Sequence, residues 1–212
     1  MTQLPSTFRS LGERSGSEPG NPAPATASSP NADAADIVDP GWVSLASGGI
    51  AVPADWHAWL ASRDSLTERL IEAAGAGHFR VRLLAEAKGL PWPDEAHVLG
   101  LASDEQAWLR EVALCVDEEP WVVARSVAPI VERHDAPFEG LGETSLGSWL
   151  FRQPDLERSA IQIGRNTRPI HGYTGLWQRR SVFRHSGWVL LVQESFMPAM
   201  GRALSLAASA TA

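Results

Sequence analysis

The chain has 212 residues, of which 44% are hydrophobic and 20% charged, and its formal net charge at pH 7 is −7. This composition is typical of a globular protein with one sizeable core, and it excludes collagens, coiled coils and disulfide scaffolds. No apolar run approaches the roughly 20 residues of a membrane span, and the acidic balance argues against nucleic-acid binding. The start, MTQLPSTFRS, lacks an apolar secretory segment, and Cys115 is the single cysteine. We therefore expect a cytoplasmic protein.

The composition changes along the chain and predicts three parts. Residues 1–41 hold six of the 15 prolines, few large apolar residues and no hydrophobic period. Such a segment cannot bury enough surface to offset its ordering entropy, so we predict a disordered tail. Residues 42–200 are long enough for one domain, and residues 201–212, which end in SLAASATA, are expected to form a frayed C-terminal tail.

Two helices and a strand are predicted in the first half of the domain. Pro53 precedes a short helical pattern, ADWHAWLAS. A second helix starts at Ser65, because SLTE matches a capping box and apolar residues follow at helical spacing until Gly75. FRVRLLAEA (79–87) alternates imperfectly and is predicted to be a strand.

Strands predominate in the second half, where two hairpins are predicted. AWLREVALCV (107–116) and WVVARSVA (121–128) flank the turn signal DEEP, and GLWQRRSVFRH (175–185) and WVLLVQESF (188–196) flank Ser-Gly. Between the hairpins we predict a helix from Thr144 or Ser145 through LGSWLF and a strand in SAIQIGR (159–165). Local hairpins without a βαβ rhythm predict an α+β fold, an antiparallel sheet with helices on one side.

Alternation places arginines among apolar side chains in the first hairpin. Arg110 shares a face with Trp108, Val112, Leu114 and Val116, where a guanidinium is costly unless an anion meets it. Arg125 shares a face with Trp121, Val123 and Val127, and symmetric pairing about Glu118 puts the two arginines roughly opposite each other. The anion is either a ligand or a buried carboxylate of the fold, and the pattern does not decide between them.

Glu194 has a comparable position in the last strand. It shares a face with Trp188, Leu190, Val192 and Phe196. Burial there would raise its pKa and suit it to proton transfer at neutral pH. The alternative is a salt bridge, because pairing about Ser186-Gly187 brings Arg179 near Glu194.

The two helix starts at Leu66 and Leu146 are further candidates for binding an anion. Free N–H groups and the helix dipole can bind a carboxylate there, although ordinary capping explains the same residues. The six histidines are scattered without ligand spacing, so no metal site is predicted. Cys115 faces away from Arg110 and has no predicted histidine partner, which argues against a nucleophile.

The order of these motifs resembles the bacterial chorismate pyruvate-lyase family, whose members make 4-hydroxybenzoate for ubiquinone. The resemblance covers most of residues 56–198 and lies in these segments: DSLTERL (64–70), WLREVALCVDEEPW (108–121), ARSVAP (124–129), LGETSLGSWLF (141–151), IGR (163–165), GLWQRRS (175–181) and LLVQESFMP (190–198).

The resemblance implies a site enclosed beneath two helical flaps, with no metal or organic cofactor. Arg110 would bind the ring carboxylate of chorismate, Glu194 would meet the ring oxygen, and Leu66 and Leu146 would be the flap positions. Leu66 departs from the family's usual Met, and the segment NTRPIHGY (166–173) is longer than the usual connection. Arg125 is a candidate for the enolpyruvyl carboxylate or for steering the anion. We expect a monomer whose partners are chorismate and 4-hydroxybenzoate.

Two alternatives stay open. A related fold serves as an effector-binding domain in transcription regulators, which would bind a small acid without chemistry. Residues 1–40 contain only Arg9 and Arg14 as basic groups, which argues against a preceding DNA-binding domain. The other alternative is a lyase that releases a different hydroxybenzoate isomer.

Overall fold

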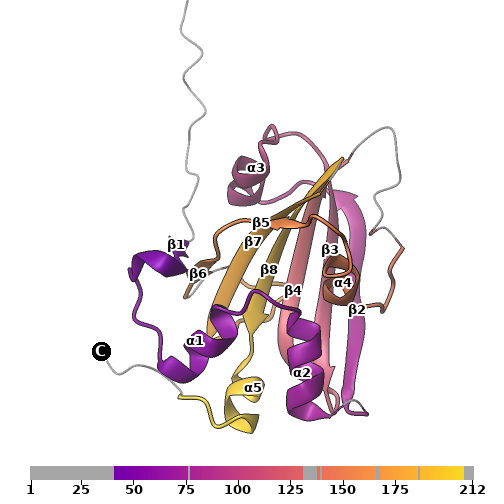
Figure 1. Ribbon diagram of the computed structural model, residues 1–212. Helices are drawn as coiled ribbons and strands as arrows, with labels where there is room; N and C mark the ends of the chain where they lie inside the picture. Colours follow the sequence, from indigo (N-terminus) through magenta and orange to yellow (C-terminus); the bar gives the residue numbers. More distant parts are fainter. Residues whose placement is uncertain are drawn as a thin grey trace, which may run out of the picture. The chain divides into compact units, whose positions relative to one another are not determined.

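The computed structural model describes residues 41–207, except residues 76, 131–137, 139, 166–167 and 186. Within this part eight strands form one antiparallel sheet in the order β1-β6-β7-β8-β4-β3-β2, with β5 paired to β7 (Figure 1). The predicted tail up to residue 40 lies outside the described residues. The strands are β1 (Val43–Ser44), β2 (Phe79–Gly89), β3 (Ala107–Val116), β4 (Glu119–Pro129), β5 (Glu157–Arg158), β6 (Gln162–Gly164), β7 (Trp177–His185) and β8 (Trp188–Phe196).

The helices pack on both faces of this sheet. A short 3₁₀ helix, η1 (Leu45–Ser47), follows β1, and the α-helices are α1 (Ala54–Leu60), α2 (Leu66–Ala74), α3 (Pro93–Leu99), α4 (Leu146–Leu150) and α5 (Pro198–Ala203). Apolar side chains of α1, α2, α4 and α5 pack on one face, which we call the inner face (Figure 1). The α+β prediction is confirmed, and α3 is an addition that packs on the opposite, outer face. No described helix is long and apolar enough to cross a membrane.

The two helices that bear on the pocket start where the sequence predicts. The Ser65 side chain accepts a hydrogen bond from the N–H of Glu68 at 3.3 Å, and α2 ends at Gly75, whose φ is +88°. Ser145 caps α4 in the same way, by accepting the N–H of Ser148 at 3.2 Å. Because each cap accepts only one N–H group, the remaining donors of the first turn are free for another acceptor.

The first hairpin corrects one prediction. Its turn consists of Asp117 and Glu118, both with positive φ, as in a type I′ turn. A β-bulge then makes Trp121 an extra residue, because Cys115 pairs with Pro120 and Leu114 with Val122. The bulge brings Trp121 to the inner face but leaves the later odd-numbered residues of β4 on the outer face.

The prediction that Arg110 and Arg125 share an inner face is therefore wrong. Arg110 pairs with Ser126, and Arg125 pairs with Glu111. Directly paired residues point to the same side, and a difference of one position changes the side. Arg125 thus lies on the outer face, while Arg110 and Ser126 lie on the inner one.

Two further features differ from the predicted boundaries. Helix α3 was not predicted, although Pro93 at its first position and Glu95, whose Oε2 accepts the N–H of Trp92 at 2.8 Å, are ordinary start signals. Helix α5 runs to Ala203, so it crosses the predicted domain boundary at residue 200, and its Gly201 is buried.

Candidate active site

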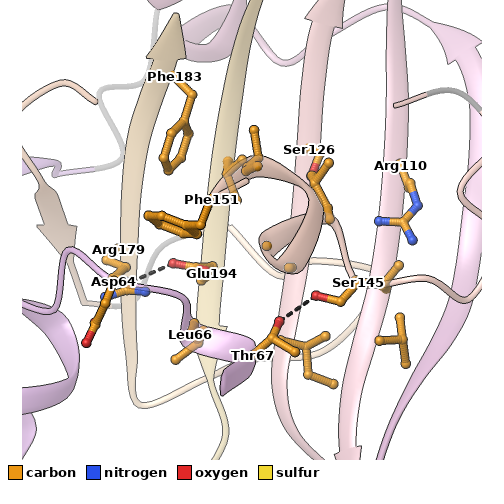
Figure 2. A pocket seen from close by; sticks show the side chains of 18 of the residues that line it. Asp64, Leu66, Thr67, Arg110, Ser126, Ser145, Phe151, Arg179, Phe183 and Glu194 are labelled. Carbon is orange, nitrogen blue, oxygen red and sulfur yellow. Dashed lines mark hydrogen bonds and ion pairs between the residues drawn. The ribbon is translucent and has the colours of Figure 1, made fainter. Parts of the chain in front are cut away.

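A pocket lies between the inner face of the sheet and the first turns of α2 and α4 (Figure 2). Its empty volume, including the opening to solvent, is about 560 Å³. Apolar side chains form much of its lining. The charged residues that line it are Asp64, Arg110, Arg158, Arg179 and Glu194.

The two helix starts meet over this pocket. The hydroxyls of Thr67 and Ser145 are hydrogen-bonded at 2.5 Å, which joins α2 to α4. A Cβ atom on Gly147 would lie 3.1 Å from Thr67 Oγ1, so the absence of a side chain there allows this close approach. The buried side chains of Leu66 and Leu146 line the pocket, which agrees with their predicted position in two helical flaps.

Arg110 is one of the two most completely buried charged groups of the pocket, with 1% of its side chain exposed, as for Arg179. Its Nη2 donates to the carbonyls of Gly142 at 2.8 Å and Thr144 at 2.9 Å. Its Nε is buried and has no hydrogen-bond acceptor among the described residues. The nearest carboxylate of the described residues is that of Glu86, 3.9 Å from Nε, and Glu86 already accepts hydrogen bonds from Trp108 and Gly140.

Within the described part of the chain, this environment leaves Arg110 without a close counter-ion. Burial lowers the pKa of its guanidinium below the ordinary value, although the negative charge of Glu86 opposes the shift. A buried cation that lacks a contacting anion is costly, and a bound carboxylate would remove that cost. Arg110 is therefore equipped to bind an anionic ligand.

Glu194 lines the pocket and also forms the predicted salt bridge. Arg179 Nε contacts Glu194 Oε2 at 2.5 Å, and Arg179 Nη1 donates to the carbonyls of Trp59 at 2.8 Å and Ser62 at 3.0 Å. The pairing of Arg179 with Glu194 across the β7–β8 hairpin confirms that interpretation. The other oxygen, Oε1, has no hydrogen bond to another described residue, and Glu194 is one of the residues that line the pocket.

The structure does not bring Arg125 to the pocket. On the outer face its Nε contacts Glu95 Oε1 and its Nη1 contacts Glu111 Oε1, both at 2.7 Å, and its guanidinium lies 4.1 Å from the ring centre of Trp92. This arrangement is the alternative in which a buried arginine pairs with carboxylates of the fold. Cys115 also lies on the outer face, as predicted from alternation.

Sequence reasoning missed two charged residues of the pocket. Arg158 is in the two-residue strand β5, which is too short for alternation to show a face. Asp64 immediately precedes the Ser65 cap, where a polar residue is common and does not indicate a binding site. Among the described residues, no three His, Cys, Asp or Glu side chains gather as a potential metal-binding group.

The fold and the pocket define a small α+β protein with a pocket between its sheet and two helix starts, lined in part by a buried arginine. The profile of the chorismate lyase family matches residues 44–202. A probable chorismate pyruvate-lyase from Chromohalobacter salexigens is 45% identical over 79% of this chain and 93% of that protein. One from Aromatoleum aromaticum is 39% identical over 69% of this chain and 86% of that protein. The chain therefore belongs to the chorismate lyase family of enzymes.

Solved structures give weaker similarities. The effector domain of PhnF from Mycobacterium smegmatis is 15% identical, covers 61% of this chain and 88% of that chain, and has a TM-score of 0.41.

The position of Arg125 leads to a first prediction. Arg125→Met leaves Glu95 and Glu111 buried without their cation, so the free energy of unfolding should fall by about 3–5 kcal/mol. The KM for chorismate, measured below the melting temperature, should stay within about twofold of wild type, because Arg125 is not in the pocket.

The control is Arg202→Met, which removes an exposed arginine 3.4 Å from Glu119 and should cost no more than about 1 kcal/mol. If Arg125→Met left the stability unchanged but raised the KM tenfold, the structural role of Arg125 would be contradicted and a role in substrate binding supported.

Proposed function

We propose that this protein converts chorismate to 4-hydroxybenzoate and pyruvate, a first committed step towards ubiquinone, in the cytoplasm. One observation carries the proposal: the buried Arg110 faces a largely apolar pocket and contacts no carboxylate of the described residues. Chorismate carries a ring carboxylate that would supply this missing anion. The many relatives named as probable chorismate pyruvate-lyases support the same substrate.

The ring carboxylate is assigned to Arg110 and the two helix starts. A guanidinium offers N–H donors in a planar fork that matches a carboxylate. The N–H groups of Leu66 and Leu146 are in the first turns of α2 and α4, where backbone donors have no partner within the helix. A main-chain contact would also explain why Leu66 can replace the family's usual Met.

The hydroxyl end is assigned to Glu194. Figure 2 shows Arg110 on one side of the pocket and the Glu194–Arg179 pair on the other. Arg179 balances the charge of Glu194, and its three carbonyl contacts fix the direction of the pair. The carboxylate can then accept a hydrogen bond from the ring hydroxyl and assist proton movement.

Little chemistry is required of the protein beyond this positioning. The ether C–O bond at the ring breaks, the enolpyruvyl side chain leaves, and a ring carbon loses a proton so that the ring becomes aromatic. The side chain gains one proton as it becomes pyruvate, so the reaction is balanced without an added reagent. Aromatisation supplies the driving force, and the pocket supplies orientation and shelter from water.

The first test of this proposal is direct. Incubation of the pure protein with chorismate should give 4-hydroxybenzoate and pyruvate in equal amounts, identified by chromatography and a coupled pyruvate assay. EDTA should leave the rate unchanged, because no residue in the proposed mechanism acts through a metal. A different hydroxybenzoate isomer would contradict the product assignment, and activity lost with EDTA and restored by a divalent ion would contradict the cofactor assignment.

Replacement of Arg110 should mainly weaken ligand binding, whereas replacement of Glu194 should mainly lower kcat. Arg110→Ala should weaken 4-hydroxybenzoate binding by about 2–5 kcal/mol, because the carboxylate is present in substrate and product. Glu194→Ala should lower kcat by about 10²–10⁴, the range for a general acid or base, with a smaller effect on product affinity. Calorimetry and steady-state rates measure the two effects.

Glu194→Gln separates the catalytic role from a structural one. It keeps the shape of the side chain but removes the charge that Arg179 contacts. A lower melting temperature with wild-type single-turnover rates would show that Glu194 serves only as the structural partner of Arg179.

A further inference from the structure

Arg158 is a second pocket-lining arginine that contacts no carboxylate of the described residues. Its Nε donates to Ser181 Oγ and its Nη1 to the carbonyl of Ser62, both at 3.1 Å, and its guanidinium lies 5.1 Å from the ring centre of Phe183. These contacts orient the side chain but neutralise none of its charge. Nη2 has no hydrogen-bond acceptor among the described residues.

Three buried arginines of the described part are paired with carboxylates. Arg125, Arg179 and Arg180 each have a carboxylate oxygen within 2.8 Å. Of the three arginines that line the pocket, Arg179 is thus paired, whereas Arg110 has only a carboxylate at 3.9 Å and Arg158 has none within ion-pair distance. The pocket therefore presents two cations that contact no carboxylate of the described residues.

The charge of Arg158 is costly where it lies. Burial lowers the pKa of its guanidinium to about 10, and repulsion by Arg179 and Arg63 adds to the shift, against the attraction of Glu194 and Asp64. The group is still protonated at neutral pH. An anion bound in the pocket would offset the cost.

We propose that Arg158 binds the second carboxylate of the substrate, the one on the side chain that leaves as pyruvate; this inference rests on the proposed function. The position follows from the shape of chorismate, in which the ether-bearing carbon is next to the carbon that carries the hydroxyl. With the hydroxyl at Glu194, the leaving carboxylate falls at the Glu194 end of the pocket. Arg158 is at that end, because its Nη1 donates to the same Ser62 carbonyl as Nη1 of Arg179, the arginine that contacts Glu194.

This assignment predicts that substrate and product bind to different sets of arginines. The substrate has two carboxylates and engages both Arg110 and Arg158. The product has only the ring carboxylate, so it is held at Arg110 and Glu194 while Arg158 loses its anion with pyruvate. Arg158 is therefore expected to act on affinity for di-acids and not on affinity for 4-hydroxybenzoate.

The experiment compares two ligands on the full-length protein by calorimetry. The di-acid is 3-[(1-carboxyvinyl)oxy]benzoate, an aromatic compound that carries both carboxylates of chorismate and cannot aromatise further. The mono-acid is 4-hydroxybenzoate. Arg158→Gln should weaken the di-acid at least about 30-fold, the lower end for loss of a buried charge partner, and the mono-acid less than about threefold.

Arg63→Gln is the matched control. Arg63 is an exposed neighbour that donates to the Arg158 carbonyl at 3.1 Å and does not line the pocket, so its loss should change neither affinity more than about twofold. Arg158→Lys keeps the charge without the planar fork and should reduce the ratio of di-acid to mono-acid affinity by about tenfold. This variant decides the matter if the Gln variant does not fold.

Equal weakening of both ligands would mean that Arg158 only positions the Ser62 loop and Phe183, and it would overturn the inference. An unchanged di-acid affinity in either variant would also overturn it. Turnover of chorismate by the wild-type protein tests the proposed function separately. If the protein turns over chorismate and the Arg158 variants have the same KM as wild type, the proposed function stands and the role of Arg158 is wrong. If the protein binds the di-acid through Arg158 but does not turn over chorismate, the proposed lyase function is contradicted instead.

Discussion

The buried guanidinium of Arg110 constrains the rest of the pocket. Its Nη2 is held by two carbonyls of the segment that leads into α4, so the arginine fixes the start of that helix over the sheet. The same group lacks a contacting carboxylate, and its Nε lacks an acceptor among the described residues. The fold thus contains one half of a charge pair, and a ligand with a carboxylate would complete it.

The two faces of the sheet differ in how far their arginines are paired with carboxylates. Arg110 and Glu111 are neighbours in β3 and point to opposite sides. On the outer face, Glu111 and α3 supply carboxylates that close an ion network around Arg125, and Asp94 does the same for Arg180. On the inner face, two arginines stay open to the pocket. The outer network stabilises the sheet against α3, while the inner face is left to the ligand.

Much of the fold could be predicted because its signals are local. Turn residues marked both hairpins, serine caps marked α2 and α4, and alternation placed Arg110 and Glu194 on the inner face. The face of Arg125 could not be predicted in this way. One extra residue, Trp121, interrupts the alternation of β4, and the exact pairing of the hairpin depends on the tertiary contacts of that bulge.

Arg158 shows a different limit of sequence reasoning. A strand of two residues has no period, and the contacts that orient Arg158 come from Ser62 and Ser181, 96 and 23 positions away along the chain. The ion network of the outer face could not be predicted from the sequence for the same reason, since Glu95 and Arg125 are 30 positions apart. Partners at such separations are defined by the assembled sheet and not by any local pattern.

The most direct test of the central claim is a crystal structure of the protein with 4-hydroxybenzoate bound. The account predicts the ligand carboxylate within about 3 Å of the Arg110 guanidinium and of the N–H groups of Leu66 and Leu146, with the phenolic oxygen at Glu194. A carboxylate bound instead at Arg158 or Arg179, with Arg110 still lacking an anion, would contradict it.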